Sequence, residues 1–239
     1  MKVSEIRRGP LWTGVVSKHC GLASALNEGD CNSGGSSRDA TAYAGMTADE
    51  LAALSLSESI PEASLGMAAI NSLIDIDTGS SKEGDAAGFI IKAGRGKNVS
   101  IIGHFPFVEK VREVARNLWV IEKRPQPGDL QESASRTCLP KSDIIAISST
   151  TLINHTLPGL LELCPSQSIK ILLGPTTPMS TVLFRHGVDM VSGSVVTDTA
   201  LVLENINKGM SFSAMKQRGG IKLLNLVRND SGIHLDIKD

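Results

Sequence analysis

The chain is poor in aromatic residues and carries no excess of charge of either sign. Aromatic side chains make up 3% of its 239 residues, and the formal net charge is -1 at pH 7. Few aromatic rings leave few platforms on which nucleic-acid bases can stack. A balanced charge provides no field that attracts nucleic acid or an anionic membrane. We therefore expect no nucleic-acid partner.

The chain also lacks an uninterrupted apolar stretch of about 20 residues, the length that spans a bilayer. Its opening residues, 1–8, lack the apolar core of a secretory signal. Hydrophobic residues at 41% and charged residues at 21% are ordinary for a globular protein. We therefore expect a cytoplasmic protein with no membrane partner and room for one large domain or two small ones.

Cysteine is scarce and scattered. Cys20, Cys31, Cys138 and Cys164 never stand at the two-residue spacing of a zinc knuckle or a redox pair. Isolated cysteines in a reducing compartment are mostly small buried hydrophobes. The alternative is a soft-metal site at His19, Cys20 and Cys31. Because neighbouring residues of a strand point to opposite faces, His19 and Cys20 share one ion only if the strand ends there.

Residues 1–76 predict a small α+β domain. Residues 11–17 and 20–26 are patterned as two strands joined by a tight turn. Thr47 and Glu50 have the spacing of a helix capping box, and Pro61 suits the first turn of a second helix. Between the strands and the helices, residues 29–38 form a loop rich in glycine and serine. This loop is either a lid over a ligand or disordered.

A polar interval at 77–85 separates this domain from the rest, and we assign 77–98 to a linker and a connecting helix. Beyond it, strands are expected at 99–103, 118–122, 143–148, 169–173 and 189–191, and helices at 106–116, 151–163, 180–185 and 196–208. This alternation predicts parallel strands with right-handed crossovers. We therefore predict an α/β fold with a doubly wound parallel sheet over 99–229, followed by a tail at 230–239.

Loops of Gly, Ser, Thr, Pro or His follow four of these strands, at 103–106, 148–151, 174–178 and 192–194. Ligands of open α/β sheets bind outside the carboxyl ends of the strands. The pattern therefore predicts the place of a binding site. It predicts no reaction, because no catalytic triad, Walker loop or metal-ligand cluster accompanies these loops, and whether the protein is an enzyme stays open.

The first strand-to-helix turn lies where a nucleotide-binding turn would lie but has different chemistry. Glu122 follows Gly103 by 19 residues, the place where a Rossmann domain holds a ribose diol. The turn has one glycine instead of three, which disfavours an intact dinucleotide. Glu122 is equally explained as a solvated acid at a strand end. His104 directly follows the strand and is the histidine that we regard as a metal or ligand contact.

Six segments, taken in order, resemble one known family. They are LWTGVV at 11–16, CGLAS at 20–24, LGMAAINSL at 65–73, GHFP at 103–106, TTLINHTL at 150–157 and LGPTTP at 173–178. Together they resemble the family named putative heavy-metal chelation, formerly a domain of unknown function. The resemblance implies a small domain like the amino-terminal domain of enolase, a Rossmann-like domain after it, and a cleft between them.

Carried over position by position, the resemblance marks a cleft wall. It consists of Gly103, His104, Phe105, Pro106, Thr150, Asn154, Thr156, Gly174, Pro175, Thr176 and Pro178, to which we add Glu122 from its spacing. The helix at 66–71 would contribute the interface between the domains, and its Asn71 would need hydrogen-bond partners if buried. His155 stands where this family more usually has glycine, which could narrow the cleft.

Three functions follow as hypotheses. The first is a protein that binds a small polar ligand, a heavy metal or a metal chelate in the cleft, with His104 as the metal contact. The second is a transferase that uses a nucleotide or S-adenosylmethionine, based on Glu122. The third is a metal chaperone or assembly module that acts through a partner and depends on Cys20 or Cys31. The sequence leaves the oligomeric state open, a homo-oligomer included.

Overall fold

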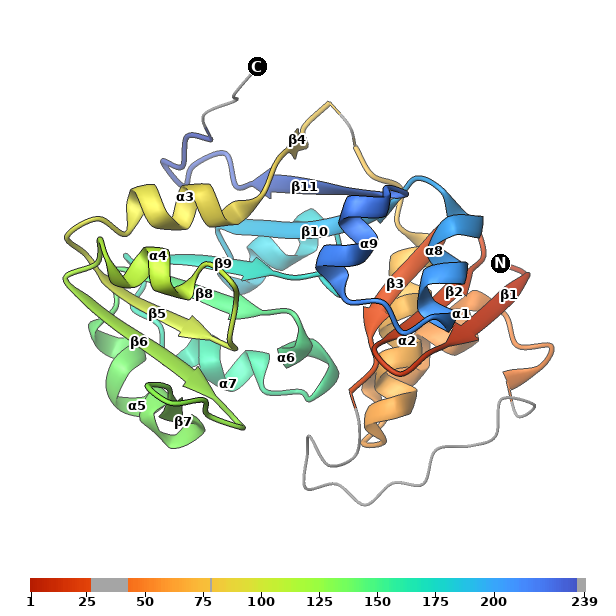
Figure 1. The fold of residues 1–239 in the computed structure, drawn as a ribbon, viewed down its shortest axis with the longest axis horizontal. Helices are drawn as coiled ribbons and strands as arrows, with labels where there is room; N and C mark the ends of the chain where they lie inside the picture. The colour runs from red at the N-terminus through yellow and green to blue at the C-terminus, as the bar shows by residue number, and fades with distance from the viewer. Residues whose placement is uncertain (27–42, 78, 236–239) are drawn as a thin grey trace.

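The computed structural model describes residues 1–26, 43–77 and 79–235. The predicted loop at 29–38 and Cys31 lie outside these residues. The described chain folds into a three-stranded sheet and an eight-stranded sheet with helices around both (Figure 1). None of the described helices has the length and apolarity needed to cross a membrane.

The small sheet is antiparallel and has the order β1 (Glu5–Arg8), β2 (Trp12–Val16) and β3 (Cys20–Ser24). The predicted hairpin is β2–β3, and β1 is an addition that the sequence analysis missed. Helix α1 (Ala48–Ala53) begins at the predicted capping box, in which Thr47 accepts from the Glu50 backbone and Glu50 accepts from the Thr47 backbone. The short 3-10 helix η3 (Leu54–Leu56) leads into α2 (Ile60–Leu73).

Helix α2 packs on β3 at a distance that only glycine permits. A Cβ atom on Gly21 of β3 would lie 2.1 Å from the Ala68 carbonyl oxygen of α2. On the other side of the helix, a Cβ on Gly66 would lie 2.0 Å from the Ser55 backbone nitrogen of η3. Small residues on facing elements therefore set the spacing of this layer.

The large sheet has the order β4-β11-β10-β9-β8-β5-β6-β7 in the described part of the chain. Its strands are β4 Lys82–Glu83, β5 Asn98–Ile102, β6 Asn117–Glu122, β7 Leu130–Gln131, β8 Ile144–Ser148, β9 Ile169–Leu173, β10 Met190–Val196 and β11 Ile221–Val227. The neighbouring strands β10, β9, β8, β5, β6 and β7 are parallel to one another. Strand β11 is antiparallel to β10, and β4 is antiparallel to β11.

Helices cover both faces of the large sheet, as predicted for a doubly wound fold (Figure 1). Helices α3 (Ala86–Ala93) and α4 (Val108–Arg112) pack on one face through buried aliphatic residues such as Ile90 and Val111. Helices α5 (Ser135–Cys138) and α7 (Leu157–Glu162) pack on the other face, where Leu157 and Leu160 are buried. Short 3-10 turns η4 (Glu132–Ala134) and η5 (Leu139–Lys141) flank α5.

Four predicted elements differ from the observed ones. The helix expected at 106–116 is limited to α4, and the helix expected at 151–163 is broken into α6 (Thr150–Ile153) and α7. The helix expected at 180–185 is the 3-10 helix η6 (Thr181–His186). Residues 192–194 lie inside β10 and not in a loop, because this strand continues in antiparallel pairing with β11. Helix α9 (Phe212–Arg218) and β11 were not predicted as elements.

Helix α8 (Thr199–Asn207) follows the parallel strands in the chain but packs on the amino-terminal small sheet. Trp12 and Leu22 of that sheet form a buried cluster with Val202 and Ile206 of α8. The small sheet therefore lies between α2 and α8, and the amino- and carboxyl-terminal parts of the chain share a core.

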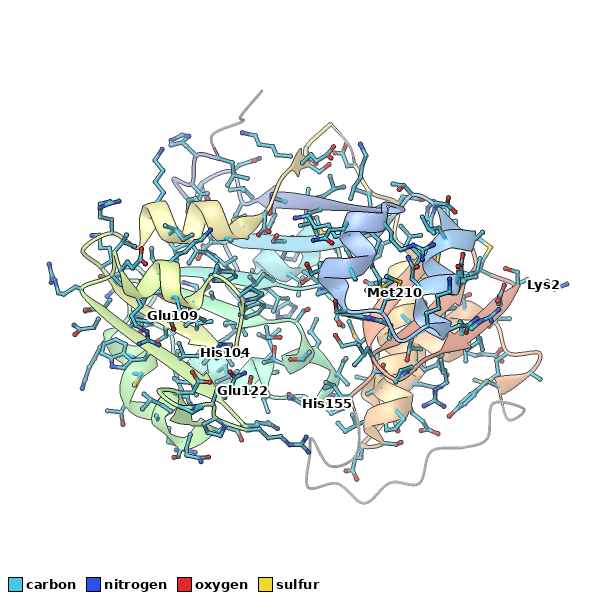
Figure 2. The ribbon with its side chains drawn as sticks, in the orientation of Figure 1. Lys2, His104, Glu109, Glu122, His155 and Met210 are labelled. Carbon is cyan, nitrogen blue, oxygen red and sulfur yellow. The ribbon has the colours of Figure 1, made fainter. Side chains whose placement is uncertain are left out.

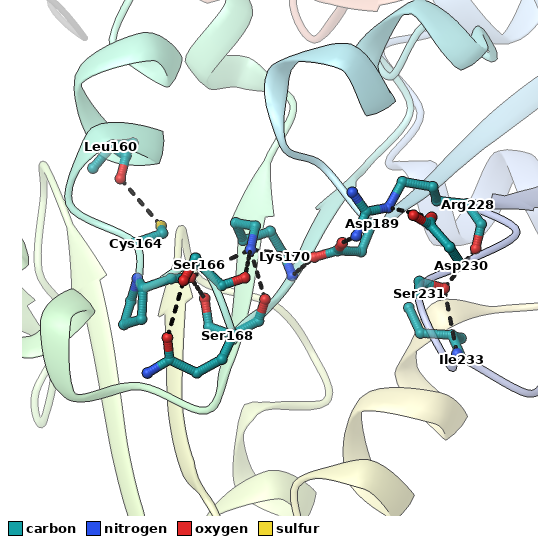
Figure 3. A network of polar contacts seen from close by, with 12 residues as sticks. Leu160, Cys164, Ser166, Ser168, Lys170, Asp189, Arg228, Asp230, Ser231 and Ile233 are labelled. Carbon is teal, nitrogen blue, oxygen red and sulfur yellow. Dashed lines mark hydrogen bonds and ion pairs between the residues drawn. The ribbon is translucent and has the colours of Figure 1, made fainter.

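An ionic network closes the amino ends of β9 and β10 (Figure 3). Lys170 donates its backbone N–H to Asp189 Oδ2 at 2.8 Å, and its Nζ donates to the Ser168 carbonyl at 2.6 Å. Arg228 lies 2.8 Å from the other carboxylate oxygen of Asp189. Both Lys170 and Asp189 are buried, so each offsets the cost of removing the other from water.

Candidate functional site

A small polar cavity lies at the carboxyl ends of β5, β6 and β8, the edge where the sequence predicts a ligand. Its volume is about 60 Å³. Five predicted residues line it, namely Gly103, Glu122, Thr150, Asn154 and Thr156, together with Ile102, Ile121, Lys123, Glu132, Ser135, Ser148, Thr151 and Leu160. We call it the strand-end cavity.

Hydroxyl and amide groups of β8 and α6 form one side of the strand-end cavity. The hydroxyl oxygens of Ser148 and Thr150 lie 2.8 Å apart. After α6, the Thr156 hydroxyl donates to Asn154 Oδ1 at 2.6 Å. Of the Ser148 and Thr150 hydroxyl groups, either can donate to the other, so this part of the wall can offer a ligand a donor or an acceptor.

Glu122 and the turn after β5 form the opposite side. The two carboxylate oxygens of Glu122 accept from the backbone N–H groups of His104 at 3.1 Å and Lys123 at 2.7 Å. Gly103 has φ +99°, a backbone conformation that favours glycine, and a Cβ there would lie 3.0 Å from Ser148 Cβ. Glu122 therefore holds the turn in place as well as lining the cavity, and Figure 2 shows His104 and Glu122 on neighbouring strand ends.

His104 itself pairs with a buried carboxylate. Its Nδ1 lies 2.9 Å from Asp129 Oδ2, and the Asp129 side chain is 1% exposed. The Gln126 backbone N–H also donates to this oxygen. A carboxylate accepts, so Nδ1 carries the proton and the pair fixes the orientation of the ring. Asp129 comes from the loop between β6 and β7, and no sequence spacing connected it with His104.

His155 has a backbone conformation that favours glycine. It lies in the turn between α6 and α7 with φ +59°, the one positive φ among the described non-glycine residues. L-residues pay about 1–2 kcal/mol for this conformation. The imidazole compensates in part, because its Nε2 lies 2.9 Å from the Ser57 carbonyl. This hydrogen bond ties the α6–α7 turn to the segment after η3.

Residues in the loop after β9 form hydrogen bonds that connect the two sheets. Thr176 is fully buried, and its hydroxyl oxygen accepts from the Ser24 backbone N–H at 2.9 Å. Asn71 of α2 donates through Nδ2 to the carbonyls of Thr176 and Leu22, at 3.1 and 2.9 Å. The Nδ2 group of Asn71 thus has two partners, whereas its buried Oδ1 has none among the described residues.

The other predicted residues of the cleft wall do not line the strand-end cavity. Gly174 has φ +125°, and a Cβ there would lie 2.8 Å from Ser149 Oγ. Pro175 accepts from the Ser194 hydroxyl, and Pro178 lines a different cavity beside α6. Phe105 stacks on Phe107, and Pro106 is exposed between them. The predicted set is therefore divided between a cavity and packing contacts.

Several lining residues were not in the predicted set. Ser148 belongs to the Ser-Ser-Thr-Thr run after β8, a signal that was visible in the sequence. Lys123, Glu132 and Ser135 reach the cavity from β6 and the η4–α5 segment. That segment follows a long irregular loop, so its position over the strand ends comes from tertiary packing.

The described residues do not form a metal centre. No group of three His, Cys, Asp or Glu side chains within 1–26, 43–77 and 79–235 is arranged to hold a metal ion. His104 is paired with Asp129 alone, and both oxygens of Glu122 accept backbone N–H groups. The predicted role of His104 as a metal contact therefore finds no further protein ligand among these residues.

Among the cysteines in the described chain, Cys20 and Cys138 are buried, and Cys164 is half-buried and donates to the Leu160 carbonyl. Cys20 packs in the cluster between the small sheet and α8, and burial raises the pKa of its thiol to about 11. Burial likewise raises the pKa of Cys164 to about 11 and that of Cys138 above its usual value. Thiolates bind soft metals, so these environments oppose metal binding at neutral pH.

Comparisons with known proteins agree with this fold. Two crystal structures of DUF364-family proteins of unknown function are similar to the chain. The one from Desulfitobacterium hafniense has a TM-score of 0.80 and 24% identity, over 95% of this chain and 92% of that chain. The one from Pyrococcus horikoshii has a TM-score of 0.79 and 21% identity, over 95% and 93%.

Sequence comparisons add a relative and a family. An uncharacterized protein from Methanocaldococcus jannaschii is 28% identical over 169 residues, which are 66% of this chain and 65% of that protein's length. A family model with the description "Putative heavy-metal chelation", DUF364, matches residues 85–225, and a second model with the same description matches 1–74. The chain therefore belongs to the DUF364 family of putative heavy-metal chelation proteins.

Proposed function

We propose that the protein binds a small polar organic ligand through the strand-end cavity. The observation that carries this proposal is the convergence of five predicted residues from three separate chain segments on one polar cavity. It lies at the carboxyl ends of parallel strands, where open α/β sheets bind their ligands.

The lining chemistry narrows the ligand. Glu122 and Glu132 contribute carboxylate oxygens, and Lys123 Nζ lies 3.9 Å from Glu132. Hydroxyl groups of Ser148, Thr150 and neighbouring residues fill the rest of the polar surface. A hydroxyl or amino group of the ligand finds acceptors here, and a volume of about 60 Å³ suits one such functional group and not a whole nucleotide.

The family description points to heavy metals, and the described side chains do not provide their usual ligands. Soft metals prefer thiolate and imidazole, whereas no cysteine or histidine of the described chain lines this cavity, and its polar side chains carry mainly oxygen atoms. A metal would therefore reach this site as a chelate, with the organic part of the chelate in contact with the protein. We propose that the family's description, heavy-metal chelation, applies to this chain through the binding of such a chelate.

Native mass spectrometry of protein purified without chelators or metal-affinity resin tests the proposal. The native mass is compared with that of the denatured chain. A small organic adduct or a metal chelate is the expected result. An adenosine-containing adduct would instead support a nucleotide- or S-adenosylmethionine-dependent transferase. Metal that depends on Cys20 or Cys31 would support an assembly module.

Matched variants locate the site. Thr150→Val removes one hydroxyl from the strand-end cavity with little change in shape, and Asn154→Ala removes the amide that holds Thr156. We expect both variants to lose the adduct, and His104→Ala to weaken its binding. Thr137→Val alters an exposed hydroxyl on α5 outside the cavity and should keep it. If Thr150→Val, Asn154→Ala and His104→Ala retain the adduct as fully as Thr137→Val does, the strand-end cavity is not the binding site.

A further inference from the structure

A second, larger cavity lies on the other side of α6. Its volume is about 670 Å³, and Thr151 contributes to the walls of both cavities. One wall comes from η3 and α2, and the other comes from α6, α7 and η6. It thus joins the amino-terminal layer to the large-sheet layer. We call it the apolar cavity, because aliphatic side chains form most of its surface.

Two exposed hydrophobic residues lie on the apolar cavity from opposite walls. Leu56 of η3 is 83% exposed, and Val182 of η6 is 54% exposed. A single exposed aliphatic side chain is common, but two that line one concavity together with buried Leu and Pro side chains mark an interaction site. A ligand in the cavity would cover both of them.

The polar side chains that line the apolar cavity are few, namely Ser55, Thr151, Glu162 and the two histidines His155 and His186. Glu162 is the one carboxylate in the lining, and no lysine or arginine of the described chain lines it. His155 also lines the cavity, and its Nε2 must donate to the Ser57 carbonyl because a carbonyl only accepts. A neutral imidazole then presents Nδ1 as an acceptor. An anionic ligand would face Glu162 without a fixed cation to balance it.

From these features we propose that the apolar cavity binds an uncharged, mainly apolar organic molecule that carries a hydrogen-bond donor. A volume of about 670 Å³ is within the range of roughly 300–1,000 Å³ that is typical of small-molecule pockets. The site is separate from the strand-end cavity, so it stands or falls independently of the proposed function.

Two fluorescent probes that differ by one sulfonate group test the proposal. N-phenylnaphthylamine is uncharged and has an N–H donor, and anilinonaphthalene sulfonate adds a negative charge to the same ring system. Titration of the purified protein at pH 8 should give saturable fluorescence enhancement with the neutral probe. Binding of the sulfonate should be about threefold weaker, since it faces the exposed carboxylate of Glu162 across water. Glu162→Gln should reduce the difference in affinity between the two probes.

Substitutions on the rim locate the probe. Leu56→Asp combined with Val182→Asp should weaken binding of the neutral probe about tenfold or more, because both apolar contacts are lost and negative charge is added. Both residues are exposed, so the variant should fold, which circular dichroism verifies. Leu11→Asp alters another exposed leucine away from the cavity and should bind as the wild type does.

Three results would overturn the proposal. The first is the absence of saturable binding of the neutral probe to the wild-type protein. The second is equal binding by the rim variant and the Leu11→Asp control. The third is tighter binding of the sulfonate than of the neutral probe, which would refute the assigned ligand class.

Discussion

The His104 imidazole rests on a carboxylate that is almost completely buried, with 2.9 Å between His104 Nδ1 and Asp129 Oδ2. The second oxygen of Asp129 has no hydrogen-bond partner among the described residues. The energy of a buried carboxylate therefore depends on the two donors to its other oxygen, His104 and the backbone of Gln126. This pair fixes the turn that borders the strand-end cavity.

A double-mutant cycle measures the coupling of this pair. His104→Ala, Asp129→Ala and the double variant should give a coupling free energy of about 1–2 kcal/mol, as expected for a charge-assisted hydrogen bond that is partly buried. Urea denaturation monitored by circular dichroism gives the three stability changes. If the two single changes simply add, the contact contributes nothing to stability.

His155 allows backbone strain to be separated from a hydrogen bond. His155→Ala and His155→Gly both remove the contact with the Ser57 carbonyl, but only glycine relieves the positive φ. We expect the glycine variant to be more stable than the alanine variant by about 1 kcal/mol. Thermal unfolding of the two variants side by side checks this order, and the reverse order would show that the turn is unstrained.

Gly21 should tolerate no side chain. In Gly21→Ala the new Cβ would lie 2.1 Å from the Ala68 carbonyl oxygen and 2.3 Å from the Ser72 backbone nitrogen. Strand β3 and helix α2 must then move apart, which should lower the free energy of unfolding by about 3 kcal/mol or more. Gly159→Ala in α7 is the control, because a Cβ added there would have no neighbouring atom of the described chain within 4 Å. That change should stabilise the protein by about 0.5–1 kcal/mol in urea denaturation.

The buried ionic network should be sensitive to loss of its carboxylate. Asp189→Asn leaves Lys170 buried without a counter-charge and should destabilise the protein by about 3 kcal/mol. Lys170→Met in the same background should recover part of the loss. Asp230→Asn removes an exposed partner of Arg228 and should cost less than about 0.5 kcal/mol. Similar losses in the two aspartate variants would contradict the assigned burial.

The Cys20 thiol predicts an alkaline loss of stability. Burial raises its pKa to about 11, so the folded protein holds this proton more tightly than the unfolded chain, whose thiol titrates near pH 9. The stability that the protonated thiol contributes to the folded protein is complete below pH 9 and is lost as the pH rises towards 11. Between pH 9 and pH 11, the free energy of unfolding of the wild type should fall by about 2 kcal/mol more than that of Cys20→Ala. Urea denaturation at several pH values in the presence of reductant measures the difference.

Much of the fold could be predicted because local patterns carry it. Buried parallel strands appear as continuous apolar runs, and β9 (Ile169–Leu173) has the predicted bounds. The capping box requires only that Glu50 stand three residues after Thr47. In contrast, β11 pairs antiparallel with β10 at the far end of the chain, a pairing that no local pattern encodes.

The candidate site was predicted in part for the same reason. Gly103 follows β5, Glu122 is the last residue of β6, and Thr150 comes soon after β8, so their place at the sheet edge follows from topology. Thr176 has the same kind of position but is fully buried against Ser24. Asp129 and Glu132 come from a loop and a short 3-10 turn that lack periodicity, so nothing in the sequence placed them beside the strand ends.

The sequence by itself determined that strands and helices alternate in an α/β fold, because apolar periodicity and turn residues act over a few positions, and six of its segments resemble the family. The carboxyl edge of the sheet as the place for a ligand stays a prediction. Only the tertiary structure decided which of the strand-end residues line a cavity, since that depends on side-chain packing between segments far apart in the chain. It alone placed Leu56 and Val182 on one concavity and paired His104 with Asp129. Contacts of this kind arise from the whole core, in which the position of each segment depends on all the others.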